Sequence, residues 1–399
     1  MVTGETLPIL TGLIEQHISA DVAFAVWEYY NVTRDEDFMD RYGYEIIFET
    51  ARFWASRLEW NQEKNRYEIN DVVGPDEYAE HVNNNAYTNY LAWYNMDLAL
   101  KLAGQLKESQ DTKKQQVFNR LDQALDLKEL ETTVKEKISK LYLPEPDPET
   151  GIVPQFDGFF DLKEIDLTKY RESSVVGTIY NDYNMEQISH MQVLKQSDLV
   201  VLMYLLDDLF DPENKKKNYE YYEARTLHDS SLSKSTHSVL ANDLGLHETA
   251  YRFFKGASSV DLGEEMRSSN AGIHSASMGG VWQSAVLGFG GVRIVGGELR
   301  ICPSLPEEWT ELDFHMIWRG TKLFVKVEPH QVTVTASGNP VSFELVDDWV
   351  TLENNMSVTK PIQKQRTWAG RFWACPLFLY DSAAGGIYGR CIYIRFYTK

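Results

Sequence analysis

Glu77 is the residue whose surroundings in this sequence best suit proton transfer. It lies in a polar segment, 67–89 (YEINDVVGPDEYAEHVNNNAYTN), between two stretches of helical periodicity, and Asp76 and Glu80 are close to it. Like-charge repulsion from these acids favours the protonated carboxyl group, which can donate a proton to a leaving oxygen near neutral pH. We therefore predict that Glu77 is a catalytic acid. The alternatives are an exposed loop carboxylate or helix cap, or His81 as the titrating group.

The same segment must be an ordered loop if it is to place such an acid. Gly74, Pro75 and three consecutive Asn residues do not extend a helix comfortably, and a loop of about twenty residues is usually functional or disordered. Apolar anchors argue against disorder: Tyr67, Ile69, Val72, Val73, Tyr78, Val82 and Tyr87. The side chains of Asn83, Asn84 and Asn85 offer uncharged donors and acceptors of the kind that sugar hydroxyl groups need.

Two further groups of residues have the chemistry of a polar ligand site. Lys195 and Gln196 occur in QVLKQSDLV at the expected start of a helix, where an amine and an amide together suit a hydroxyl-rich ligand; a surface Lys is the alternative. The segments 229–238 (DSSLSKSTHS) and 270–280 (NAGIHSASMGG) each place a His beside several Ser. Because backbone N–H groups at helix starts bind anions, phosphate is the expected ligand. N-capping Ser residues beside a satisfied His are the alternative.

Motifs and composition exclude several other chemistries. The chain has no GxxxxGK[ST], GxSxG or HExxH motif, and its three Cys residues lack metal-type spacing, so we predict no metal site. A net charge of −20 argues against nucleic acid and anionic membranes as partners. No apolar run is long enough to span a membrane, and no signal peptide is recognisable. Since sparse Cys residues also suit a reducing compartment, a cytoplasmic location is expected.

Helical periodicity dominates to about residue 288 and then gives way to short alternating strands. Helices are expected over 18–30, 35–58, 85–106, 113–140 (as two helices), 183–191, 195–210, 213–227, 237–244, 248–260 and 279–287. Beyond them, 323–327, 331–335 and 341–345 alternate apolar and polar residues as half-buried strands do. Paired helices joined by long loops at one end predict a mainly α fold, an α/α toroid followed by a small β domain. A plain helical bundle is the competing architecture.

Six ordered motifs resemble glycoside hydrolase family 65, the family of maltose, trehalose and kojibiose phosphorylases. The motifs are ETARFWASR (49–57), GPDEYAEHVNNNAYTN (74–89), PQFDGFF (154–160), QVLKQSDLV (192–200), HDSSLS (228–233) and GIHSASMGG (272–280). The likeness runs from the start to about residue 358. It implies inverting phosphorolysis of an α-glucosidic disaccharide to β-glucose 1-phosphate and a free sugar. It also implies inorganic phosphate as co-substrate, no cofactor, and a homodimer.

The resemblance assigns roles to individual residues. By motif, Glu77 matches the general acid, and Lys195 and Gln196 match the pair that binds glucose. The residues that match the phosphate site are Ser230, Ser231, His274 and Ser275. An inverting hydrolase needs a second carboxylate to activate water, whereas phosphate is already an anionic nucleophile, so Ser and His in these segments fit phosphorolysis. The rival expectations are an α-glucoside hydrolase of the same fold, such as a trehalase, and an inactive sugar-binding remnant.

The resemblance also implies a domain order. The family has an N-terminal β-sandwich, an (α/α)6 barrel and a small C-terminal β domain. On this basis residues 1–288 are expected to form an N-terminally incomplete (α/α)6 toroid, and 289–360 a C-terminal β-sandwich domain, while 361–399 form an atypical tail that departs from the family. The N-terminal sandwich and the first barrel helices have no counterpart in this sequence, so we expect the chain to correspond to the C-terminal half of a longer protein.

Overall fold

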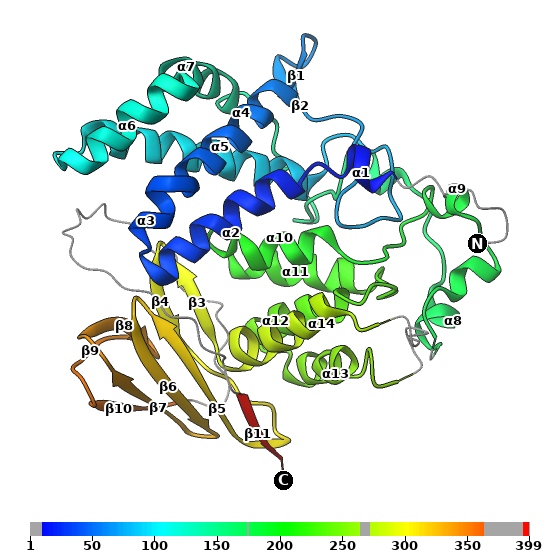
Figure 1. Ribbon diagram of the computed structural model, residues 1–399. Coiled ribbons are helices and arrows are strands. Elements are labelled where there is room, and N and C mark those ends of the chain that lie inside the picture. The colour runs from blue at the N-terminus through cyan, green and yellow to red at the C-terminus, as the bar shows by residue number, and fades with distance from the viewer. Residues whose placement is uncertain (1–9, 174, 264–271, 363–393, 399) are drawn as a thin grey trace.

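The computed structural model describes residues 10–173, 175–263, 272–362 and 394–398, which comprise a helical part and a β part (Figure 1). The helical part ends in the π-helical turn η5 (Ser284–Phe289), and the first strand of the β part, β3 (Val292–Val295), follows directly. The sequence predicted a change of this kind near residue 288. The division into domains at 288 and 360 stays a prediction, because element bounds do not show which segments fold independently.

The longer helices follow the predicted order along the chain. They are α2 (Ile18–Thr33), α4 (Tyr44–Arg57), α5 (Ala86–Glu108), α6 (Thr112–Leu125), α7 (Leu127–Ile138), α10 (Asp198–Leu205), α11 (Pro212–Glu223), α12 (Ser233–Asp243), α13 (His247–Ser258) and α14 (Ser275–Gln283). Shorter turns lie between them: α1 (Thr11–Ile14), α3 (Glu36–Phe38), η1 (Met39–Gly43), η2 (Phe159–Asp161), α8 (Thr168–Arg171), η3 (Thr178–Asn181), α9 (Met185–Ile188) and η4 (Asp207–Leu209).

Several helix boundaries differ from the prediction, and local contacts explain those at α9 and at the start of α10. The helix predicted over 183–191 shortens to α9, because Asn184 and Gln187 form a capping box at its start and Met191 pairs with the segment at Lys163. Helix α10 begins only after Ser197, whose side chain caps it, so the two residues predicted to open this helix precede it. Helix α12 begins at Ser233, four residues earlier than predicted.

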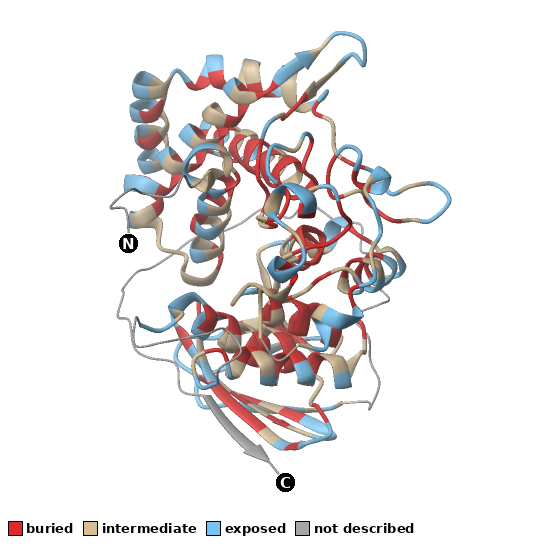
Figure 2. Ribbon diagram, turned by 90° about the vertical axis from the view of Figure 1, so that its right-hand side faces the viewer, coloured by how far each residue is buried: buried red, intermediate tan, exposed pale blue. Residues whose placement is uncertain are grey.

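Burial separates inner helices from outer ones. Helix α10 (DLVVLMYL) is apolar on all sides and buries Leu199, Val200 and Met203 completely, as a helix surrounded by protein must. Helix α12 is also buried over most of its length, whereas its antiparallel neighbour α13 buries one face and exposes the other. Figure 2 shows the buried residues gathered in the middle of the helical part and the exposed ones along its outer surface.

Several inner helices begin at the same end of the helical part. At the start of α5, Tyr87 donates a hydrogen bond from its hydroxyl to Asp21 near the start of α2, at 2.9 Å. Asn85, which caps α5, donates from its side chain to Asp198, the first residue of α10, at 2.6 Å. Helices α2, α5 and α10 therefore start side by side, and the long loops gather at that end. The helical part is an α/α toroid arrangement, as the sequence predicted.

The β part contains two sheets that form the predicted C-terminal β-sandwich. One has the order β10-β7-β6-β5-β11 and the other β3-β4-β8-β9. Their strands are β4 (Glu298–Ile301), β5 (Trp309–Trp318), β6 (Thr321–Glu328), β7 (Gln331–Ser337), β8 (Val341–Leu345), β9 (Asp348–Leu352), β10 (Ser357–Pro361) and β11 (Ile394–Thr398). Leu323, Val325 and Val327 on β6 are fully buried and alternate with more exposed residues, which confirms the predicted half-buried pattern. A two-stranded hairpin, β1 (Glu59–Asn61) and β2 (Arg66–Glu68), belongs to the helical part.

Strand β11 lies in the segment that was predicted to be an atypical tail. It pairs antiparallel with β5 and extends the larger sheet by one strand. The sequence analysis did not predict this pairing. The rest of that tail, 363–393 and 399, lies outside the described residues.

A buried ion pair and an aromatic cluster join the helical part to the β part. Arg293 on β3 donates from its guanidinium to Asp243 at the end of α12, and both side chains are 7% exposed. Burial raises the pKa of Asp243 to about 6, against the opposing effect of Arg293. The rings of Phe254 and Phe289 both pack against Trp309 on β5. Within the described ranges, no helix combines the length and the apolar character needed to cross a membrane.

Candidate active site at the start of the inner helices

The loop before α5 carries the predicted acid and is an ordered structure. Val72 and Val82 pair across the loop through two backbone hydrogen bonds of 2.9 and 3.0 Å. Ile69 and Val72 are fully buried, and Tyr78 is 2% exposed. The apolar anchors recognised in the sequence therefore fix this loop against the helical part, as predicted.

Asp76 is buried behind Glu77 and joins three segments of the chain. Its carboxylate accepts a hydrogen bond from the backbone N–H of Lys195 at 2.8 Å and another from the side-chain amide of Gln155 at 3.0 Å. Its own N–H donates to the carboxylate of Asp198 at 2.7 Å. The loop before α5, the segment 154–160 and the residues that lead into α10 thus share one buried polar network, which fixes the backbone on both sides of the candidate site.

The two carboxylates of this network are shielded from water. Asp76 is 1% exposed and Asp198 is fully buried. Burial raises the pKa of Asp76 to about 8, the charge of Asp198 adds to the rise, and the donated hydrogen bonds oppose it. Burial likewise raises the pKa of Asp198 to about 6. The pair therefore retains a proton to higher pH than exposed carboxyl groups do.

Glu77 and Lys195, which the sequence placed in one site by motif, lie in direct contact. The amine Nζ of Lys195 donates to Oε1 of Glu77 at 2.8 Å, and the two side chains are 25% and 42% exposed. The sequence predicts a different charge environment for Glu77, in which Asp76 and Glu80 repel it. The carboxylate of Asp76 is instead turned toward its own buried donors, and the charged group in contact with Glu77 is a cation.

The residues around Lys195 make further contacts with the loop before α5. Gln196 donates from its side-chain amide to the carbonyl of Pro75. The hydroxyl of Tyr78 donates to Oδ2 of Asp229 at 2.6 Å, and the N–H of Asp229 donates to the carbonyl of Lys195 at 3.1 Å. The segment that leads into α12 therefore lies beside the loop before α5 and beside the start of α10.

The two segments predicted to bind an anion lead into parallel helices. Helices α12 and α14 approach closely where Gly280 faces Ser235, and Ser284 donates from Oγ to the carbonyl of Ser235 at 3.1 Å. Further along both helices Asn242 donates to the carbonyl of Gly288, so the two run in the same direction side by side (Figure 1). Their starts are at one end of the molecule. The predicted phosphate-binding residues at those starts are Ser230, Ser231, His274 and Ser275.

Comparison with known families assigns the chain. A model of the glycosyl hydrolase family 65 central catalytic domain matches residues 1–283, and a model of the C-terminal domain of the same family matches residues 292–352. The chain belongs to glycosyl hydrolase family 65. The resemblance inferred from six sequence motifs is therefore confirmed.

Named members of family 65 are similar to this chain over most of its length. It is 48% identical over 333 residues to a kojibiose phosphorylase of Halothermothrix orenii, an alignment that covers 84% of this chain and 42% of that protein. A kojibiose phosphorylase of Caldanaerobacter subterraneus subsp. tengcongensis is 44% identical over 333 residues, with 83% and 42% covered. A solved structure of a human-microbiome protein provisionally named a kojibiose phosphorylase aligns with a TM-score of 0.77 and 30% identity, over 87% of this chain and 50% of that one. The chain thus spans less than half the length of these curated relatives.

Asn84 and Asn85, in the loop before α5, have structural roles and do not make the expected sugar contacts. Asn84 and Asn85 are 0% and 1% exposed. Asn84 donates from its side chain to Asp157 at 2.8 Å. The side chain of Asn85 caps α5 by accepting a hydrogen bond from the N–H of Thr88. The expectation that these two amides are available to sugar hydroxyl groups is therefore wrong.

Two His residues of this family 65 chain are paired with acids. His81 is exposed and lies 2.6 Å from Asp71 in the same loop, on the surface of the molecule. His274 directly precedes α14, and Asp261 contacts both its N–H, at 2.8 Å, and its Nδ1, at 2.6 Å. The side chain of His274 is 37% exposed. Asp261 thus orients a half-exposed imidazole at a helix start, while 264–271 of the same segment lie outside the described residues.

Proposed function

We propose that this chain carries the catalytic centre of an inverting disaccharide phosphorylase. The reaction is phosphorolysis of an α-glucosidic bond to β-glucose 1-phosphate and a free sugar. Glu77 protonates the leaving oxygen, and Lys195 and Gln196 hold the glucose unit. Inorganic phosphate, bound between the starts of α12 and α14, is the nucleophile. The residues that hold the phosphate are Ser230, Ser231, His274 and Ser275.

The observation that carries this proposal is the contact between Glu77 and Lys195. Asp76 and its buried partners fix the backbone under both residues, so an acid and a cationic donor are presented together from a rigid support. Rigid placement of this kind is what general acid catalysis needs. Glu77 can act as the acid once a sugar hydroxyl enters the site and displaces the ammonium group of Lys195 from its carboxyl group.

The hydrogen bonds of Asp229 favour phosphate over water as the nucleophile. Asp229 is the carboxylate next to Ser230 in the proposed phosphate segment, and a hydrolase would need such a group as its base. Its two oxygens each accept a hydrogen bond, Oδ2 from Tyr78 at 2.6 Å and Oδ1 from the N–H of Gly177 at 2.8 Å, and these bonds orient the carboxylate toward Tyr78 and Gly177. Two helix N-termini with Ser and His side chains instead suit an anion.

Kojibiose is the disaccharide to test first, because the two relatives described above are kojibiose phosphorylases. Family members named trehalose and maltose phosphorylases also match the chain, so trehalose and maltose belong in the same panel. Each sugar is incubated with the chain in the presence and absence of phosphate, and β-glucose 1-phosphate and glucose are quantified. The proposal expects phosphate-dependent formation of β-glucose 1-phosphate. Glucose release that does not depend on phosphate would indicate a hydrolase instead.

A further inference from the structure

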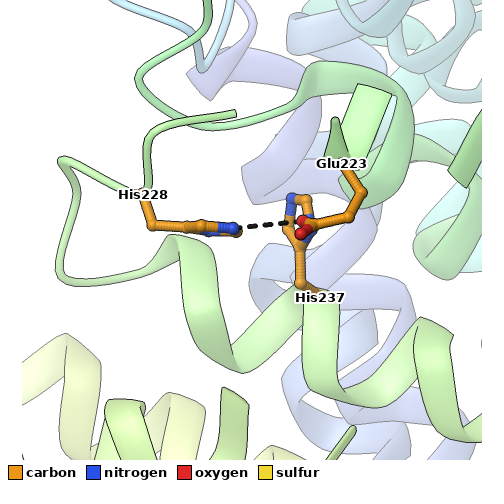
Figure 3. Close-up of side chains that lie close together, drawn as sticks. All are labelled: Glu223, His228 and His237. Atoms are coloured by element: carbon orange, nitrogen blue, oxygen red, sulfur yellow. Dashed lines mark hydrogen bonds and ion pairs between the residues drawn. The ribbon is translucent and has the colours of Figure 1, made fainter. Parts of the chain in front are cut away.

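Glu223, at the end of α11, lies between two buried His residues and is not part of the proposed catalytic set (Figure 3). Its Oε2 is 3.1 Å from Nε2 of His228 and 3.0 Å from Nδ1 of His237. Its other oxygen, Oε1, accepts a hydrogen bond from Arg171 at 2.7 Å. Burial opposes ionisation of Glu223, but the hydrogen bonds from the two His residues outweigh it and hold the pKa of the carboxyl group well below its usual range.

His228 connects this cluster to the proposed phosphate segment. Its Nδ1 lies 2.8 Å from Oγ of Ser233, the first residue of α12, so the ring reaches from the end of α11 across residues 229–232. The backbone of His228 has φ of 58°, a left-handed conformation that costs a non-glycine residue on the order of 1–2 kcal/mol. Contacts must hold this conformation, and the ring contacts of His228 are the candidates. The strained residue directly precedes Asp229 and Ser230.

A metal ion is the other reading of such a cluster. One ligand atom from each of Glu223, His228 and His237 lies within 4.8 Å of the others, a spacing that would admit a cation. Two observations favour a hydrogen-bonded clamp. The oxygen of Glu223 lies at hydrogen-bond distance from both nitrogens, so each His can donate to it without a cation between them. Arg171 also brings a positive charge to the same carboxylate, which opposes a divalent ion.

The neutral form of His228 fits the clamp. Burial lowers the pKa of His228 to about 4, so near neutral pH its ring has one donor and one acceptor nitrogen. The donor is assigned to Nε2, which faces the carboxylate of Glu223, and the acceptor to Nδ1, which faces the hydroxyl of Ser233. Both ring nitrogens of His228, the carboxylate of Glu223 and the hydroxyl of Ser233 then have a partner, and the ring of His228 has one preferred orientation.

We propose that Glu223 is a positioning residue for the phosphate segment. From the end of α11, Glu223 fixes the ring of His228, which lies between α11 and α12, and the ring of His237 on α12. Through His228 it sets the backbone of residues 229–232 and the start of α12. Glu223 does not touch phosphate. The proposal rests on the proposed function only in that this segment binds phosphate; the ordering of the segment can be measured without it.

Replacing Glu223 by Gln tests the proposal, because the amide keeps the size of the side chain but has one acceptor oxygen in place of two. It cannot accept hydrogen bonds both from the two histidines and from Arg171. Glu220→Gln is the matched control, since Glu220 lies one turn earlier on α11 and lines the same cavity of about 650 Å³ beside Arg171. Amide hydrogen exchange is followed in both variants. E223Q should accelerate exchange across 228–233 about tenfold and leave 74–78 unchanged, whereas E220Q should change neither. Unchanged exchange across 228–233 in E223Q would overturn the proposal.

Phosphate binding gives the second readout. The dissociation constant for inorganic phosphate, measured by calorimetry, should rise about tenfold in E223Q, which corresponds to about 1.4 kcal/mol, and stay constant in E220Q. Normal binding with accelerated exchange would also overturn the positioning role. If the wild-type chain binds no phosphate, the proposed function fails, and exchange alone decides the role of Glu223.

A second variant and a metal analysis cover the remaining outcomes. If E223Q does not fold, Ser233→Ala removes one hydroxyl group from Nδ1 of His228 and should accelerate exchange in the same segment by a smaller factor. Elemental analysis of the purified wild-type chain should give less than one metal ion per ten chains. A stoichiometric metal that is lost in E223Q would overturn the clamp in favour of a metal site.

Discussion

Replacing Asp76 by Ala should destabilise the chain and separate Lys195 from Glu77. The carboxylate of Asp76 accepts hydrogen bonds from the backbone N–H groups of Lys195 and Tyr78 and from the side chain of Gln155, which is fully buried. In Asp76→Ala these donors lose their acceptor, and each buried donor left unpaired costs about 1–3 kcal/mol. This cost is partly offset because a buried carboxylate is removed as well, so we expect the free energy of unfolding to decrease by about 3 kcal/mol.

Urea unfolding measures this loss, and Asp71→Asn is its control. Asp71 lies in the same loop but is exposed, and its contact is with exposed His81, so D71N should change the free energy of unfolding by less than about 0.5 kcal/mol. Turnover should fall in D76A even at temperatures where the variant is folded, because the support beneath both site residues is gone. A D76A chain with wild-type stability and wild-type turnover would refute the assignment of Asp76 as the centre of the network.

Three further predictions follow from buried groups. As the pH rises, Asp76 and Asp198 keep their protons longer in the folded chain than in the unfolded chain. The free energy of unfolding should therefore fall between about pH 4 and about pH 8, and D76N should make this fall smaller. A free energy of unfolding that rises over this range would contradict the assignment. A Cβ at Gly74 would lie 2.2 Å from Oδ2 of Asp198, so Gly74→Ala should lower the melting temperature by several degrees, about 2 kcal/mol, and an unchanged melting curve would contradict the close approach. Arg293→Met leaves Asp243 buried without its partner and should lower the free energy of unfolding, measured in urea, by about 3–5 kcal/mol. A decrease of less than about 1 kcal/mol would contradict this prediction.

The sequence was informative where a local pattern determines the structure. The apolar anchors of 67–89 predicted an ordered loop, and buried Ile69 and Val72 confirm it. The alternation around Leu323 predicted strand β6, because one face of a sheet must be apolar. Six motifs identified family 65, and Glu77 and Lys195, which come from two of them, are in contact in the structure.

Long-range pairing is what the sequence could not provide. Asp76 and Asp198 are 122 residues apart in the chain, and Asp229 is 151 residues from Tyr78, so no periodicity reports these contacts. The error about Asn84 has the same cause, since its partner Asp157 comes from a distant loop. Strand β11 was missed because its pairing depends on the free edge of β5 rather than on a pattern of its own.

The most direct test of the central claim is the leaving-group dependence of Glu77→Gln. With a disaccharide and phosphate, loss of the general acid should lower kcat by about 10²–10⁴, while Glu80→Gln, an exposed acid in the same loop, should have no effect. With 2,4-dinitrophenyl α-glucoside, whose leaving group needs no proton, E77Q should approach the wild-type rate of phosphorolysis. An equal loss with both substrates would show that Glu77 binds or positions the sugar and does not protonate it, and the assigned mechanism would be wrong.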